Sequence, residues 1–109
     1  MRDAPARVMA VRDSGGFSVR VTDAEILAAI PRIARGSNVF AEPAAAATYA
    51  GLLKAVKEGK VKKNESVVLL ITGNGLKDIQ SAMKSVGKPY VIQPDLTELK
   101  KLVADNKLA

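Results

Sequence analysis

The side chains available for chemistry are restricted in type, because this 109-residue chain contains neither cysteine nor histidine. Disulfides, thiolate or imidazole metal sites, cysteine nucleophiles and Ser-His-Asp triads are therefore excluded for this sequence. Any chemistry has to come from lysines, carboxylates, hydroxyls, backbone groups or a bound cofactor. We accordingly expect no metal site.

The most informative element is a turn at residues 72–75 (Thr-Gly-Asn-Gly), which directly follows a continuous apolar run at 67–71. In open α/β sheets, ligands bind beyond the carboxyl ends of strands. Glycines at 73 and 75 allow a close approach of backbone to a ligand, and a following helix could present N–H groups to an anion. The spacing is neither a P-loop nor a dinucleotide-binding motif, so an ordinary strand-to-helix turn is an equal alternative.

A second candidate is Glu42, which stands between the short apolar segment 39–41 and a helix expected to begin at Pro43. A carboxylate beside buried structure is costly unless it is paired or hydrogen-bonded. Glu42 therefore either caps nearby N–H groups, which residue types alone favour, or forms part of the wall of an active site.

Strands and helices that alternate along the chain would have to position these residues. The expected strands are 17–21, 39–41, 67–71 and 89–92, with 67–71 central and covered on both faces. The expected helices are 6–13, 23–36, 43–58, 79–86 and a terminal helix that ends near 104. The alternation predicts an α/β fold, with a mostly parallel sheet and flanking helices, in one domain over residues 1–109.

Local signals support the helix that begins after Thr22. Thr22 and Glu25 have the spacing of a capping box, and the segment 36–38 (Gly-Ser-Asn) is typical of a helix end. Pro31 lies inside this helix and removes one internal hydrogen bond, so a kink or a break is expected there.

The net charge of +6 and the isoelectric point near 9.8 would suit a polyanionic partner. However, the densest lysine cluster, at 54–63, has no interleaved aromatic side chain on which bases could stack. We therefore expect a solvated helix end and no nucleic-acid partner. No apolar run approaches the ~20 residues of a membrane span, which favours a cytoplasmic protein without a membrane partner.

Four blocks of residues occur in a specific order and spacing. They are 14–16 (Ser-Gly-Gly), 21–26 (Val-Thr-Asp-Ala-Glu-Ile), 39–44 (Val-Phe-Ala-Glu-Pro-Ala) and 72–78 (Thr-Gly-Asn-Gly-Leu-Lys-Asp). From about residue 6 to residue 85 the chain closely resembles the C-terminal part of the threonine synthases, which are fold-type II pyridoxal-phosphate enzymes. The resemblance implies a segment of the large cofactor-binding domain of such an enzyme.

This resemblance implies roles for four residues at the pyridine end of the cofactor. Thr72 matches the threonine that faces the pyridine nitrogen, and Gly73 and Asn74 would line the same end of the ring. Glu42 matches the glutamate of the family's Glu-Pro-Ala block, close to the same end. A neutral hydroxyl can donate to an unprotonated ring nitrogen without stabilising a pyridinium, which gives the threonine a physical rationale.

The resemblance also implies an activity, namely the conversion of O-phosphohomoserine and water to threonine and phosphate by a carbon–oxygen lyase. The lysine that holds pyridoxal phosphate as a Schiff base, and the phosphate-binding loop, lie in parts of the family that have no match here. We therefore expect no catalytic residue in this chain and no activity from it alone. Its partner would be the remainder of the enzyme, or a second copy through exposed apolar faces. The alternative is a non-catalytic small-anion-binding or regulatory domain that uses the turn at 73–75.

Overall fold

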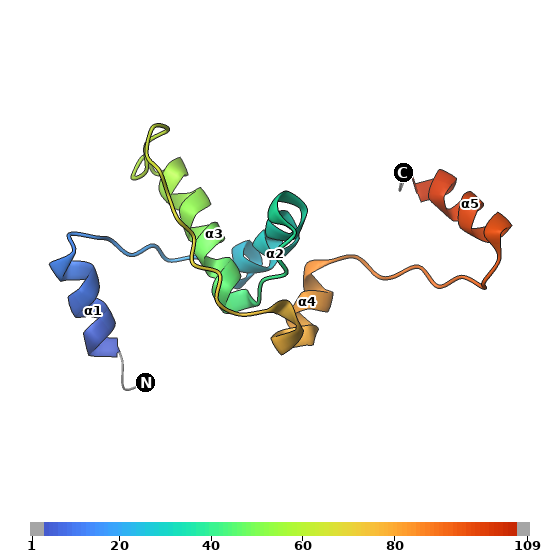
Figure 1. The fold of residues 1–109 in the computed structure, drawn as a ribbon, viewed down its shortest axis with the longest axis horizontal. Helices are drawn as coiled ribbons and strands as arrows, with labels where there is room; N and C mark the ends of the chain where they lie inside the picture. The colour runs from blue at the N-terminus through green and yellow to red at the C-terminus, as the bar shows by residue number, and fades with distance from the viewer. Residues whose placement is uncertain (1–3, 107–109) are drawn as a thin grey trace.

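The structure is a computed structural model and describes residues 4–106. Its elements are α1 (Ala4–Asp13), α2 (Asp23–Ser37), α3 (Pro43–Lys57), the 3₁₀ helix η1 (Gly75–Asp78), α4 (Ile79–Ser85) and α5 (Leu96–Asn106). Figure 1 shows α2, α3 and α4 together in the middle of the molecule, with α1 and α5 at opposite ends. None of the helices in this range is long and apolar enough to cross a membrane.

The predicted α/β fold with a mostly parallel sheet is wrong. Between residues 4 and 106 there is no strand, and β pairing is limited to one antiparallel bridge between Ala41 and Asn74. The segments 17–21, 67–71 and 89–92, predicted as strands, run as irregular chain, and the predicted strand 39–41 is reduced to that bridge. An apolar pattern indicates that a segment can be buried. A strand also needs a neighbouring segment with which its backbone can form hydrogen bonds.

The outcome is clearest at residues 67–71, which the sequence predicts to be covered on both faces. The side chain of Val68 is 91% exposed and that of Leu70 is 72% exposed. Only Leu69 and Ile71 in this segment are partly buried. No other described segment pairs with the backbone of this run, so Val67, Val68 and Leu70 remain exposed, whereas Ile71 packs against the hydrophobic core.

The core of the molecule is the contact between α2 and α3. Ala29, Ile30 and Ile33 of α2 are buried against a cluster that includes Ala46 and Ala50 of α3. Alanines let the two helix backbones approach closely, but each of them buries little apolar area. The hydrophobic contribution of this core to stability is therefore modest.

Local sequence signals set the ends of α2, as predicted. The Thr22 side chain accepts a hydrogen bond from the N–H of Glu25, and the Glu25 carboxylate accepts one from the N–H of Thr22 at 2.7 Å. Asn38 ends the helix in the left-handed conformation with φ 58°. The helix continues through Pro31 without a break. Packing against α3 on both sides of the proline offsets the hydrogen bond that it removes.

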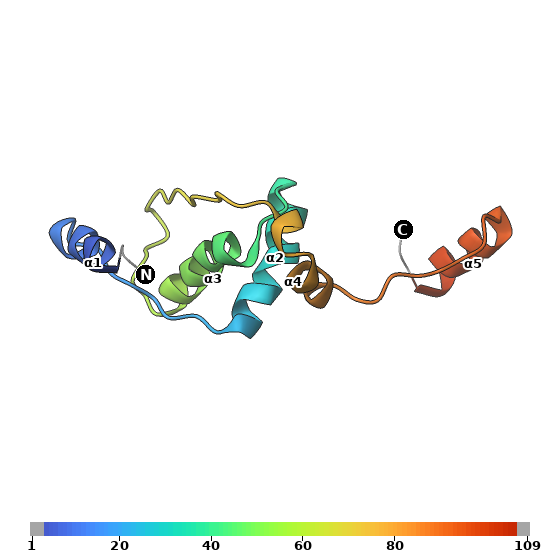
Figure 2. The same cartoon turned by 90° about the horizontal axis from the view of Figure 1, so that it is seen from below.

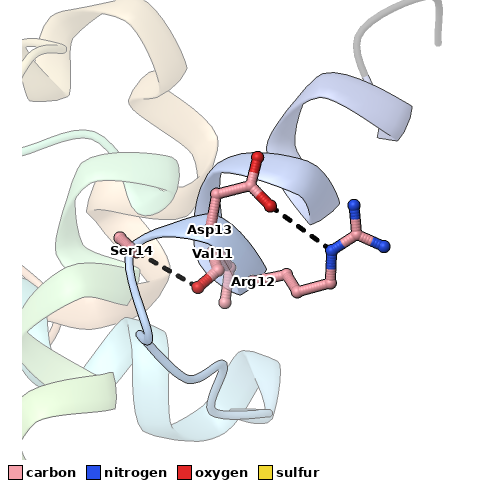
Figure 3. Close-up of polar contacts among 4 residues, drawn as sticks. All are labelled: Val11, Arg12, Asp13 and Ser14. Atoms are coloured by element: carbon pink, nitrogen blue, oxygen red, sulfur yellow. Dashed lines mark hydrogen bonds and ion pairs between the residues drawn. The ribbon is translucent and has the colours of Figure 1, made fainter.

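The predicted end of α1 at Asp13 is also confirmed, whereas α5 ends at Asn106, two residues beyond the predicted end. At the end of α1, the Ser14 hydroxyl donates to the Val11 carbonyl oxygen at 3.1 Å, and Arg12 pairs with Asp13 (Figure 3). Gly15 follows with φ 68°, a conformation that favours glycine. At the other end of the molecule, the Asp95 carboxylate caps α5.

The chain as a whole is elongated. Its radius of gyration is 18.3 Å and its principal extents are 61 × 35 × 20 Å. A compact domain of this length would have a radius of gyration of about 13 Å. Figure 2 shows the same separation from a second direction, with α1 and α5 away from the central helices.

Candidate cofactor-facing site

Two segments that are distant in sequence meet at the beginning of α3. The N–H of Glu42 donates to the carbonyl oxygen of Gly73 at 2.9 Å, and the N–H of Gly75 donates to the carbonyl oxygen of Phe40 at 2.9 Å. These two hydrogen bonds flank the bridge between Ala41 and Asn74. The structure therefore brings together the two motifs that the sequence analysis singled out separately.

Close packing explains why glycine stands at positions 73 and 75. A Cβ atom on Gly73 would overlap the carboxylate of Glu42. A Cβ atom on Gly75 would overlap the ring of Phe40. Both glycines therefore make room for side chains of this same chain, a role that was not predicted beside the tight turn and the approach of a ligand.

The side chain of Glu42 does not cap α3, so the interpretation favoured by residue types alone is wrong. Glu42 occupies the N-cap position in an extended conformation, but its carboxylate accepts no capping hydrogen bond. The carboxylate instead lies 3.7 Å from the ammonium group of Lys77, and the Glu42 side chain is only 16% exposed. This ion pair offsets part of the cost of holding the carboxylate in a largely buried position.

Lys77 is the residue of this site that the sequence reasoning missed. It lies in η1, and its side chain is 75% exposed. No local spacing links it to Glu42, because the pair forms only when the two loops meet. Its place in the 72–78 block was the one available signal.

The hydroxyl of Thr72 is free in the described part of the chain. Thr72 is exposed, and no hydrogen bond joins its hydroxyl to any residue between 4 and 106. The capping positions nearby are filled by other side chains. Asn74 accepts from the N–H of Leu76 at 2.9 Å, and Asp78 accepts from the N–H of Ser81 at 3.0 Å.

The carboxylate of Asp78 belongs to the structure of this turn. The N–H of Ser81, followed by its hydroxyl, stabilises the charged form and lowers the pKa of Asp78 below its ordinary value. Asp78 is therefore committed to the start of α4. Chemistry at the turn would have to use Thr72, the Glu42–Lys77 pair or the unused amide protons of Asn74.

The turn offers few N–H groups to an anion. The N–H of Gly75 donates to Phe40, that of Leu76 to Asn74 and that of Lys77 to the Asn74 carbonyl oxygen. An anion could use these three N–H groups only by displacing their hydrogen bonds. The N–H groups of Gly73 and Asn74 donate no hydrogen bond within residues 4–106, so the alternative of a small-anion site at 73–75 stays a prediction.

Comparison with known proteins places the chain in a family. The family described as "Pyridoxal-phosphate dependent enzyme" matches residues 2–73. The chain is 38% identical to threonine synthase from Methanocaldococcus jannaschii over 103 residues, which cover 94% of this chain and 25% of the relative. It is 51% identical to threonine synthase from Mycobacterium leprae over 79 residues, which cover 72% of this chain and 22% of the relative. The chain thus spans about a quarter of the length of these curated relatives.

Proposed function

This chain belongs to the pyridoxal-phosphate-dependent enzyme family, and we propose that it lines the pyridine end of the cofactor in a threonine synthase. The complete enzyme would convert O-phosphohomoserine and water to threonine and phosphate. Bound pyridoxal phosphate supplies an electron sink for the substrate, which is chemistry that no side chain offers. The task of this segment is to hold and tune one end of that cofactor.

The free hydroxyl of Thr72 is the observation that carries the proposal. It is exposed beside the contact between Glu42 and Gly73, and the nearby caps are provided by Asn74 and Asp78. A hydroxyl without an internal partner is available as a donor to a ring nitrogen. Because this donor is neutral, it favours the unprotonated pyridine ring.

Glu42 and Lys77 would act together at the same end of the ring. An uncompensated carboxylate there would favour protonation of the ring nitrogen through its negative charge. The ammonium group of Lys77, at 3.7 Å, balances that charge. The pair thus supports the same neutral ring state as the Thr72 hydroxyl.

The remaining functions would come from other parts of the enzyme. The N–H groups of Gly75, Leu76 and Lys77 are already used within the chain, and the family's phosphate-binding loop has no match here, so another part of the enzyme would hold the cofactor's phosphate. None of the lysines lies in a match to the family's cofactor-binding lysine motif. We infer that the 109 residues alone are inactive and that their partner is the remainder of the enzyme.

A chimera tests this proposal. The matching quarter of the Methanocaldococcus jannaschii threonine synthase is replaced by this chain, and phosphate release from O-phosphohomoserine is measured. We expect activity from the chimera and none from the 109 residues alone. A matched control inserts the chain with Thr72→Val, which leaves Gly73 and Gly75 in place and should lower phosphate release. Activity of the isolated chain, or a folded, cofactor-bound but inactive chimera, would contradict the proposal.

A further inference from the structure

The ring of Phe40 packs directly on the turn that carries Thr72. The ring occupies the space that a Cβ atom on Gly75 would need, so it lies in contact with the backbone of that glycine. Gly75 is buried, and its N–H donates to the carbonyl oxygen of Phe40 at 2.9 Å. The side chain and the backbone of Phe40 therefore fix the same residue of the turn.

The backbone at Thr72 is held on both sides. Before it, Ile71 packs against the hydrophobic core. After it, the carbonyl oxygen of Gly73 accepts a hydrogen bond from the N–H of Glu42 at 2.9 Å. Thr72 itself is exposed. The position of its hydroxyl is therefore set by the neighbours of the turn and by no hydrogen bond of its own within residues 4–106.

Phe40 also connects this turn to the core of the molecule. It lines one cavity together with Ile30 of α2, Leu76 of η1 and Ile79 of α4. Ile30 is only 2% exposed, whereas Phe40 is 37% exposed, so most of the Phe40 surface is covered within this chain. A side chain packed between a buried helix and a turn can hold that turn at a fixed distance from the core.

We propose that Phe40 is a positioning residue for Thr72, and that its ring holds the turn where the Thr72 hydroxyl can donate to the pyridine nitrogen. This inference rests on the proposed function and adds a residue to it. A hydrogen bond weakens steeply when its geometry is disturbed, and a misplacement of about 1 Å can cost roughly a hundredfold in rate. Leucine at position 40 would leave part of the space over Gly75 empty, so the turn could move.

Hydrogen exchange in the 109-residue chain tests the positioning without cofactor or activity. In Phe40→Leu, we expect the amides of Glu42 and Gly75 to exchange at least about tenfold faster, while amides in the middle of α3 change less than about threefold. Phe17→Leu is the matched control, because the Phe17 ring faces the ammonium group of Lys60 at 5.5 Å and not the turn. It should leave both turn amides within about twofold. Unchanged turn amides in Phe40→Leu, or equal acceleration throughout α3, would overturn the proposal.

A double-mutant cycle in the chimera tests whether Phe40 acts through Thr72. Phe40→Leu should change the cofactor absorbance in the same direction as Thr72→Val and lower turnover at least about threefold, but not more than Thr72→Val does. In the Thr72→Val background, Phe40→Leu should lower turnover by less than about twofold further. Phe40→Tyr keeps a ring over Gly75 and should retain most of the turnover.

The outcomes separate this inference from the proposed function. If the effects of Phe40→Leu and Thr72→Val simply multiply, Phe40 does not act through Thr72, and the inference fails while the proposed function stands. An unchanged spectrum and turnover in Thr72→Val would instead overturn the proposed function, and this inference with it.

Discussion

The apolar side chains of α2 and α3 cover one another within this chain, whereas three of the five side chains of the apolar segment 67–71 stay exposed. All eight buried hydrophobic residues described lie between Ala29 and Ala55, whereas Val68 and Val91 are about nine-tenths exposed. The helices are joined by a short connection, so they can pack against each other at low entropic cost. Within residues 4–106, the segment 67–71 has no backbone partner, and Val67, Val68 and Leu70 lack side-chain cover. Its exposed side chains agree with a chain that spans a quarter of its relatives.

Hydrogen exchange should separate these two regions by the largest margin. Amides in the middle of α2 and α3 donate within helices, whereas no backbone acceptor is present for residues 67–71 in the described range. We expect exchange at 67–71 to be at least about a hundredfold faster in dilute solution. Protection at 67–71 should rise with concentration, because a second copy can cover the apolar face. Equal protection of both regions in a dilute monomer would contradict the comparison.

Substitution of Gly75 tests whether the two loops at the beginning of α3 are closely packed. Gly75→Ala would force the new methyl group against the Phe40 ring and should lower the free energy of unfolding by about 1–2 kcal/mol. Gly51→Ala is the matched control, because a Cβ atom there meets open space inside α3. It should raise the free energy of unfolding by about 0.5–1 kcal/mol. Chemical denaturation measures the free energy of unfolding of each variant. The two substitutions are expected to change it in opposite directions, and a change in the same direction would contradict the close packing at Gly75.

The smallest expected effect is a pH dependence at the start of α2. Hydrogen bonds from Thr22 lower the pKa of Glu25 below the ordinary 4.5. The folded state therefore gains stability above that value and loses it as pH falls through the lowered folded pKa. Glu25→Gln keeps a capping acceptor but removes this titration. The stability difference between wild type and Glu25→Gln should shrink between pH 6 and pH 3, and a constant difference would contradict this assignment. The pKa values of Glu58, Asp78 and Asp95 are also lowered, but these groups are present in both proteins, so their titration cancels in the difference.

Sequence reasoning succeeded where the structure is determined locally. The Thr22–Glu25 capping box, the left-handed Asn38 and Pro43 at the first turn of α3 set helix ends through contacts within a few residues. The same reasoning failed for the sheet. The β-branched run at 67–71 indicates a preference for burial, but whether it forms a strand depends on pairing with a segment distant in sequence.

The candidate site shows the same division. The turn at 72–75 and Glu42 were identified from sequence, and the structure brings them into contact. The ion pair of Glu42 with Lys77 and the packing of Phe40 over Gly75 could not be predicted, since each requires that the two loops meet in space. Spacing along the chain contains no information about that meeting.

The role of Thr72 as donor to the ring nitrogen is tested most directly by comparing Thr72→Val with Thr72→Ser in the chimera that contains this chain. Serine keeps the donor and should retain most of the turnover. Valine keeps the shape but leaves the ring nitrogen without a partner, at a cost of about 1–3 kcal/mol, so turnover should fall roughly five- to 150-fold with a changed cofactor absorbance. In the 109-residue chain, Thr72→Val should alter the free energy of unfolding by less than about 0.5 kcal/mol, because the hydroxyl has no partner among the described residues. An unchanged spectrum and turnover in Thr72→Val would contradict the assignment of Thr72 to the cofactor.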